Sequence, residues 1–174
     1  MIQVVAVVGP TGSGKTALGI GIEDALETEI TTLVVTVTDS GNVNIVETDA
    51  IDLASVTTAA GSITIASGGT LMATDIDSST TDDDSNDISL TTTAGDIAVV
   101  SINAGSVNDV TLASAGAITE DGDAATVLSA DVLAATAGRA ITLDTMVASA
   151  DLATSAAGDI DIDETDAIDL ASVT

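Results

Sequence analysis

The sequence alternates apolar and polar residues with a period of two over most of its length. In residues 158–163 (GDIDID) isoleucine alternates with aspartate, and residues 62–65 and 87–90 show the same alternation. This period places Ile, Leu and Val on one face of a β-strand and Asp, Thr, Ser and Asn on the other. Val, Ile and Thr also suit a pleated, half-buried surface. We therefore expect an all-β fold with a long series of short strands from about Leu33 onward.

Glycines separate these predicted strands at regular distances. A small residue, a glycine and then the start of a strand recur at Gly41, Gly61, Gly95, Gly105, Gly116, Gly138 and Gly158. The successive intervals are 20, 34, 10, 11, 22 and 20 residues. Glycine tolerates a positive φ, which suits a sharp turn between strands. A unit of ~20 residues that holds two or three short strands is typical of a solenoid, so we expect a β-solenoid with coils of that length.

A longer repeat is superimposed on this pattern. Residues 47–57 (ETDAIDLASVT) recur without change as residues 164–174, which lie 117 positions further on. The preceding residues also correspond, with GNVNIV before Glu47 and GDIDID before Glu164. We interpret residues 19–174 as a solenoid repeat region with a 117-residue super-repeat, and residues 1–18 as a separate leader.

The composition limits both the core and the partners of such a fold. The chain has no aromatic residue, Cys or His, so its core must be built from Val, Ile, Leu and Ala. Its formal net charge is −26, and Lys15 and Arg139 are its only basic residues. Nucleic-acid binding needs clustered Lys and Arg, so we expect no nucleic-acid partner. Residues 2–8 are apolar but too short to span a bilayer, and they lack the basic leader of a secretory signal, so we expect no membrane insertion.

Several phrases resemble the repeat regions of giant bacterial surface adhesins of the filamentous haemagglutinin type. They are AGDIDIDETDAIDL (residues 157–170), TTAGDIAVV (92–100), ASAGAITEDGD (113–123) and ALETEITTL (25–33). The resemblance implies a right-handed parallel β-helix that is exported to the cell surface and acts as a stalk, fibre or adhesive rod. The secretion-recognition domain of such proteins is missing here, and the opening sixteen residues do not follow the repeat pattern.

The function expected from this resemblance is structural. The chain would be a segment of a repetitive extracellular or cell-surface fibre protein, without catalytic activity. Unpaired strand edges at the ends of a β-helix can pair with further strands. We therefore expect end-to-end self-association, or contact with neighbouring repeats of a longer chain.

An alternative function follows from residues 9–16 (GPTGSGKT), which match the phosphate-binding loop pattern completely. In this interpretation Gly9, Gly12 and Gly14 let backbone N–H groups approach the phosphates of ATP or GTP. Lys15 would reach the terminal phosphates, and the Thr16 hydroxyl would hold Mg²⁺. The chain would then be a nucleotide-binding protein.

The surrounding sequence departs from what such a loop requires. Residues 7–18 (VVGPTGSGKTAL) are similar to the loop of tRNA dimethylallyltransferases, in which a long helix follows and a downstream Asp-Ser-x-Gln motif supplies the catalytic aspartate. Here Asp39 and Ser40 are followed by Gly41 and Asn42, and no helical period appears after Thr31. The competing interpretation of residues 1–16 is a non-native leader, a fused tag or one more coil.

The most acidic stretch is residues 75–87 (DIDSSTTDDDSND), which coincides with the long 34-residue interval between glycines. We expect a loop that protrudes from the solenoid. Asp82, Asp83, Asp84 and Asp87 are candidate Ca²⁺ ligands, because Ca²⁺ prefers clustered carboxylate and carbonyl oxygens. The alternative is a solvated turn with weakly associated counterions.

Overall fold

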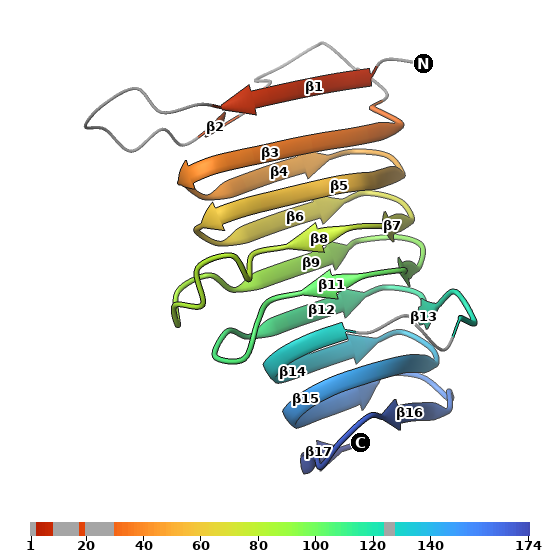
Figure 1. The fold of residues 1–174 in the computed structure, drawn as a ribbon. Coiled ribbons are helices and arrows are strands. Elements are labelled where there is room, and N and C mark those ends of the chain that lie inside the picture. The colour runs from red at the N-terminus through yellow and green to blue at the C-terminus, as the bar shows by residue number, and fades with distance from the viewer. Residues whose placement is uncertain (1–2, 9–17, 20–29, 124–127) are drawn as a thin grey trace.

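The protein is a stack of parallel β-strands wound into a solenoid of about seven turns (Figure 1). The computed structural model describes residues 3–8, 18–19, 30–123 and 128–174. The strands are β1 (Gln3–Val8), β2 (Leu18–Gly19), β3 (Thr32–Ser40), β4 (Val43–Glu47), β5 (Ile51–Ala60), β6 (Ile63–Ser67), β7 (Leu71–Ala73), β8 (Ile76–Asp77), β9 (Ile88–Thr92), β10 (Ile97–Val99), β11 (Ile102–Asn103), β12 (Val110–Ser114), β13 (Ile118–Glu120), β14 (Leu128–Ala137), β15 (Ile141–Thr154), β16 (Ile160–Glu164) and β17 (Asp169–Val173). No helix occurs in these residues, so the predicted all-β parallel solenoid is confirmed.

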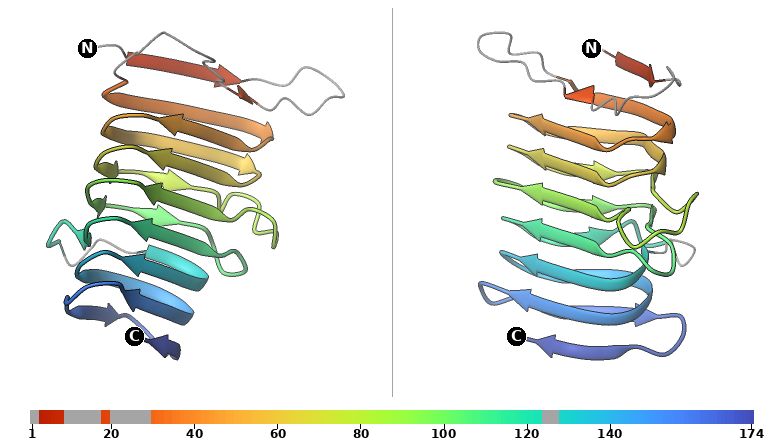
Figure 2. Two further views of the ribbon diagram at one scale, coloured as in Figure 1. Left: turned by 180° about the vertical axis from the view of Figure 1, so that it is seen from behind. Right: turned by 90° about the vertical axis from the view of Figure 1, so that its left-hand side faces the viewer.

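Each turn of the solenoid contributes strands to three stacks, which we call faces 1, 2 and 3. Face 1 consists of β2, β4, β6, β9, β12, residues 133–137 of β14, residues 149–154 of β15, and β17. Face 2 consists of residues 32–33 of β3, residues 51–53 of β5, β7, β10, β13, residues 141–143 of β15, and β16. Face 3 consists of residues 35–36 of β3, residues 56–57 of β5, β8, β11, residues 128–130 of β14, and residues 145–147 of β15. Figures 1 and 2 show β4, β6, β9 and β12 stacked along one side of the molecule, opposite β5, β8 and β11.

The core consists of rows of aliphatic side chains that run along the solenoid axis. In face 1 the in-register row is Val43, Ile63, Ile88, Val110, Leu133 and Ala150, and all six are buried. The matching row in face 2 is Ile51, Leu71, Ile97, Ile118 and Ile141. Strands in such stacks lie about 4.8 Å apart, so like side chains pack directly on one another. This explains how a chain without aromatic residues forms a core.

The corner between faces 1 and 2 requires glycine. Gly95 has a φ of +87°, and a Cβ built on it would lie 2.6 Å from Thr70 Oγ1 and 2.7 Å from Thr70 N. The Gly116 N–H donates to Gly95 O at 2.8 Å, and a Cβ on Gly116 would lie 2.7 Å from the same oxygen. Coils therefore approach each other here more closely than any side chain allows. The regularly spaced glycines lie at two different corners. Gly95 and Gly116 lie between faces 1 and 2, whereas Gly41 and Gly61 lie directly before strands of face 1.

The two copies of the eleven-residue segment lie on different faces. In the first copy Leu53 is in face 2, whereas in the second copy Leu170 pairs with Ala150 in face 1. Five successive in-register pairs connect Val43 to Ala150, so these two residues lie five coils apart in face 1. The chain then continues into the next face, where it forms β16. The 117-residue repeat is therefore not a whole number of coils.

Two local features are nevertheless shared by both copies. Ala54 is skipped in the pairing of β5 with β3, and Ala171 is skipped in the pairing of β17 with β15. The glutamate that opens each copy, Glu47 or Glu164, accepts the N–H of the next residue with Oε1, at 2.9 and 3.1 Å. The segment thus specifies a capped turn and a bulged strand, and the coil lengths before it decide which face it joins.

The backbone of residues 3–8 adds a further strand to the stack. β1 pairs in parallel with β3, from Gln3 beside Thr32 to Val8 beside Val37. The division of the chain at residue 18 remains a prediction. Within the described part of the chain, no helix is long and apolar enough to cross a membrane.

Candidate functional surfaces

The predicted nucleotide site cannot be placed in the structure. Gly9, Gly12, Gly14, Lys15 and Thr16 lie outside the described residues, so nucleotide binding by this loop remains a prediction.

The acidic stretch forms a loop between β8 and β9 that projects from the stack, as Figure 1 shows. One of its carboxylates faces the next coil. Asp82 Oδ2 accepts a hydrogen bond from Ser106 Oγ at 2.7 Å, and Asp82 Oδ1 accepts one from the Ser106 N–H at 3.1 Å. Asn108 Nδ2 donates to the same Oδ1 at 3.4 Å. Asp82 therefore joins two loops that are more than twenty residues apart in the sequence.

Two buried asparagines lie beneath this contact. The Asn86 N–H donates to Asn108 Oδ1 at 3.2 Å, and Asn108 Nδ2 donates to Ala104 O at 2.6 Å. Asn86 Nδ2 completes the arrangement by donating to Thr81 O at 2.5 Å. These asparagine side chains form hydrogen bonds with loop backbone groups that are not paired within the sheet. Buried polar groups need such partners. The sequence analysis did not identify these asparagines. Each lies two residues before the first core residue of a strand, which is the position that Gly61 occupies before Ile63.

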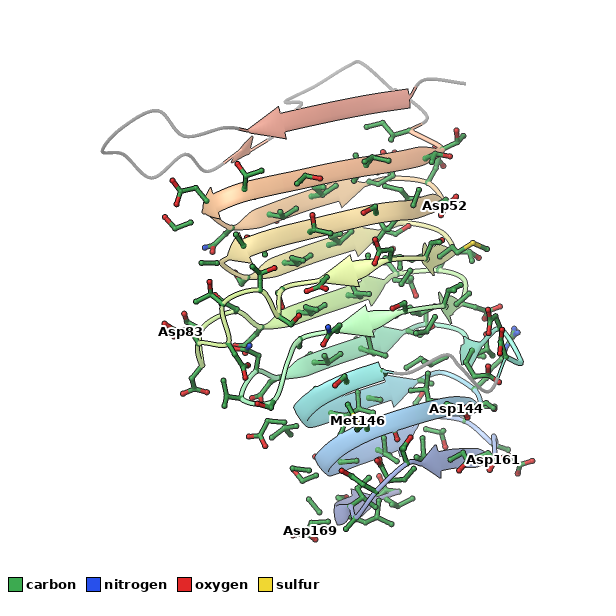
Figure 3. The ribbon with its side chains drawn as sticks, in the orientation of Figure 1. Asp52, Asp83, Asp144, Met146, Asp161 and Asp169 are labelled. Atoms are coloured by element: carbon green, nitrogen blue, oxygen red, sulfur yellow. The ribbon has the colours of Figure 1, made fainter. Side chains whose placement is uncertain are left out.

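The other predicted calcium ligands do not converge with Asp82. Asp87 Oδ1 accepts the Asp109 N–H at 3.0 Å, and Asp83 Oδ1 accepts Ser85 Oγ at 3.3 Å. Figure 3 shows Asp83 pointing outward at the edge of the loop. Among the described residues no group of three or more acidic side chains could hold a metal ion. Calcium binding by Asp82, Asp83, Asp84 and Asp87 thus remains a prediction without a preformed site.

Carboxylates do accumulate where face 3 turns into face 1. Partial desolvation raises the pKa of the exposed Asp109 above its ordinary value of 3.8, and the charges of Asp87, Asp131 and Asp84 raise it further. The Val132 N–H opposes this effect by donating a hydrogen bond to the carboxylate. The corner therefore carries mutual repulsion at neutral pH, which is a cost to folding.

A row of polar side chains points into the solenoid at the end of face 1. It consists of Glu47, Ser67, Thr92 and Ser114, all of which are buried. Ser67 Oγ donates to Asp49 O at 2.6 Å, while Thr92 Oγ1 and Ser114 Oγ lie 3.1 and 3.2 Å from Gly95 O. These side chains donate hydrogen bonds to backbone carbonyl groups at the corner, which is a structural role. The alternation of the sequence predicts apolar residues at such inward positions and did not reveal them.

The C-terminal end of the stack exposes side chains that are buried elsewhere. Leu170 is 54% and Val173 is 50% exposed. Both belong to β17, whose described pairing is to β15 on one side only. Within the part of the chain that the structure describes, no further coil pairs with this apolar strand edge.

Comparisons with known proteins do not assign a family. No protein-family model matches the chain, and neither the curated proteins nor the solved structures give a significant match.

Proposed function

We propose that this protein is a structural or adhesive segment of a repetitive bacterial cell-surface or extracellular fibre protein, without catalytic activity. The described residues support it because they form one continuous stack, in which every core row runs along the axis. In solenoids each coil contacts only its neighbours, so further coils extend the same rod. The adhesin-like phrases of the sequence support the extracellular location.

A single observation carries the proposal of end-to-end growth. Leu53 is completely buried in β5, which has β3 on one side and β7 and β8 on the other. Leu170 occupies the same place in an identical segment, and more than half of its surface is exposed. A further coil on β17 would bury it, whether that coil comes from a longer chain or from a second copy.

End-to-end growth can be tested with the double variant Leu170→Asp, Val173→Asp. We expect the unaltered chain to form rods whose length rises with concentration and with salt, because salt screens the repulsion between copies of charge −26. The variant places carboxylates on the exposed edge and should give short particles only. Thr119→Asp with Ser129→Asp adds the same charge to outward positions on faces 2 and 3, and this control should still form rods. Equal lengths for all three proteins in electron micrographs would contradict end-to-end growth.

A second candidate function is nucleotide binding, which the complete match of residues 9–16 favours. Titration with ATP and Mg²⁺ tests it directly. Saturable binding that is lost in Lys15→Ala would establish this function, whereas the same weak signal from both proteins would eliminate it.

A further inference from the structure

Face 1 presents an outer surface without a single charged residue across five consecutive strands, from β4 to residues 133–137 of β14. The outward residues of these strands are Asn44, Val46, Thr64, Ala66, Ser89, Thr91, Thr111, Ala113, Ala134 and Thr136. In the whole chain 28 of 174 residues are acidic. We call these ten residues the neutral face.

The acidic residues lie outside these ten positions. On face 1 itself the exposed Asp151 of β15 pairs with Ala134 and limits the neutral face at that end. Asp52, Asp77 and Asp161 point outward on faces 2 and 3, and Asp87 and Asp109 flank the corner that leads into face 1. Figure 3 places Asp52 and Asp161 on the side of the stack opposite the loop that carries Asp83. The charge is therefore distributed around the neutral face and not across it.

The neutral face has short side chains in register. Thr64 pairs with Ser89, and Ser89 pairs with Thr111, so hydroxyl and methyl groups form rows along the axis. Val46 is 74% exposed at one end of the face and is the most exposed large hydrophobic residue among those described. A sheet surface of this kind can approach another flat surface closely, at the ~10 Å spacing of packed sheets.

We propose that the neutral face is a lateral docking surface for a second copy of this chain. Two copies that each carry a charge of −26 repel one another wherever carboxylates meet. Face-to-face contact through the neutral face places no carboxylate at the centre of the interface. The same ten residues serve both partners, as a two-fold interface requires. This contact is independent of the end-to-end growth proposed above, because it uses the side of the rod.

The size of the face sets the expected strength. Five strands at about 4.8 Å and five residues at about 3.3 Å correspond to about 400 Å² per copy, or about 800 Å² in total. Stable interfaces bury about 1,200–2,000 Å². One chain should therefore dimerise weakly, and longer rods should associate more strongly because several such faces act together.

Sedimentation equilibrium of the Leu170→Asp, Val173→Asp protein tests the proposal, since this background removes growth at the C-terminal end. We expect mostly monomer at low concentration and a measurable fraction of dimer as the protein concentration is raised to about 1 mM. Adding Thr64→Asp and Thr111→Asp places two carboxylates on the neutral face and should weaken dimerisation at least tenfold. Adding Thr119→Asp and Ser129→Asp instead should leave it within about twofold. A monomer at every concentration, or equal weakening by both pairs, would overturn the proposal.

A cysteine cross-link gives a second readout that does not depend on the folding of the aspartate variants. The chain has no cysteine, and Ser89 lies on the central strand of the neutral face. Oxidation of Ser89→Cys should yield covalent dimers far faster than oxidation of Thr119→Cys on face 2. Equal rates for the two variants would count against the lateral interface.

Discussion

Leu53 and Leu170 occupy the same position in two identical eleven-residue segments, but Leu53 is 0% exposed and Leu170 is 54% exposed. Both leucines precede a bulged alanine in a strand that begins after a glutamate-capped turn. Local sequence therefore determines the capped turn and the bulge. Its burial is determined by the coils on either side, which is the property expected of a fold stabilised by contacts between neighbours.

This relationship predicts a large difference between two equivalent substitutions. Leu53→Ala leaves a cavity in the core and should lower the free energy of unfolding by about 2–5 kcal/mol. Leu170→Ala removes a side chain that is already half solvated and should cost less than about 1 kcal/mol. Urea unfolding followed by circular dichroism measures both. Similar losses for the two variants would mean that the terminal coil is covered in solution.

Asp82 should matter more for stability than its acidic neighbours in the loop. Asp82→Ala removes the acceptor of both Ser106 hydrogen bonds and should cost about 1 kcal/mol. Asp83→Ala removes one long hydrogen bond from Ser85, two residues further along the same exposed loop, and should be nearly neutral. Amide hydrogen exchange at residues 104–109 should accelerate in the first variant only. Faster exchange in both variants would show that the loop depends on its total charge.

The raised pKa of Asp109 predicts the direction in which stability changes with pH. Because its pKa is raised in the folded state, the native protein binds more protons than the unfolded chain between the ordinary value of 3.8 and the raised value. Its contribution to stability therefore falls as pH rises through that window. Asp109→Asn keeps an acceptor for the Val132 N–H and removes the charge, so it should be slightly more stable than the original protein at pH 7; solvent screening keeps the gain small because Asp109 is exposed.

Urea unfolding at pH 7 and again well below pH 3.8 isolates this effect, because Asp109 is protonated in both states at the lower pH. The gain from Asp109→Asn should vanish there. Asp83→Asn provides the matched control, since it removes one charge from the exposed loop. A gain for Asp109→Asn that persists unchanged in acid would mean that repulsion at this corner is not its cause.

The sequence predicted the strands correctly because inward and outward positions alternate at Ile63, Ile65 and their equivalents in each coil. It could not predict which face each strand joins. In-register partners are 25 residues apart between Ile63 and Ile88 but 17 apart between Leu133 and Ala150, so coils cannot be counted by length. The repeated segment consequently changes face without any change in its own residues.

The polar interior was harder to predict than the strands. Asn86 and Asn108 resemble ordinary loop residues in the sequence, and only the structure shows that each is buried and bonded to loop backbone. Thr92 and Ser114 likewise break the apolar alternation at inward positions. Such residues compensate for the irregular backbone of corners, and that backbone depends on contacts between coils that are distant in sequence.

Gly95 and Gly122 separate the two reasons for which a solenoid uses glycine at a turn. Both have positive φ, +87° and +81°, but a Cβ on Gly95 would meet Thr70 whereas a Cβ on Gly122 would meet nothing within 4 Å. Gly122→Ala should therefore cost only the backbone strain, about 1–2 kcal/mol. Gly95→Ala adds a clash with backbone at 2.7 Å and should cost clearly more, because the two coils must separate. Thermal unfolding of the two variants measures the difference, and equal losses would show that the coils at this corner can move apart without penalty.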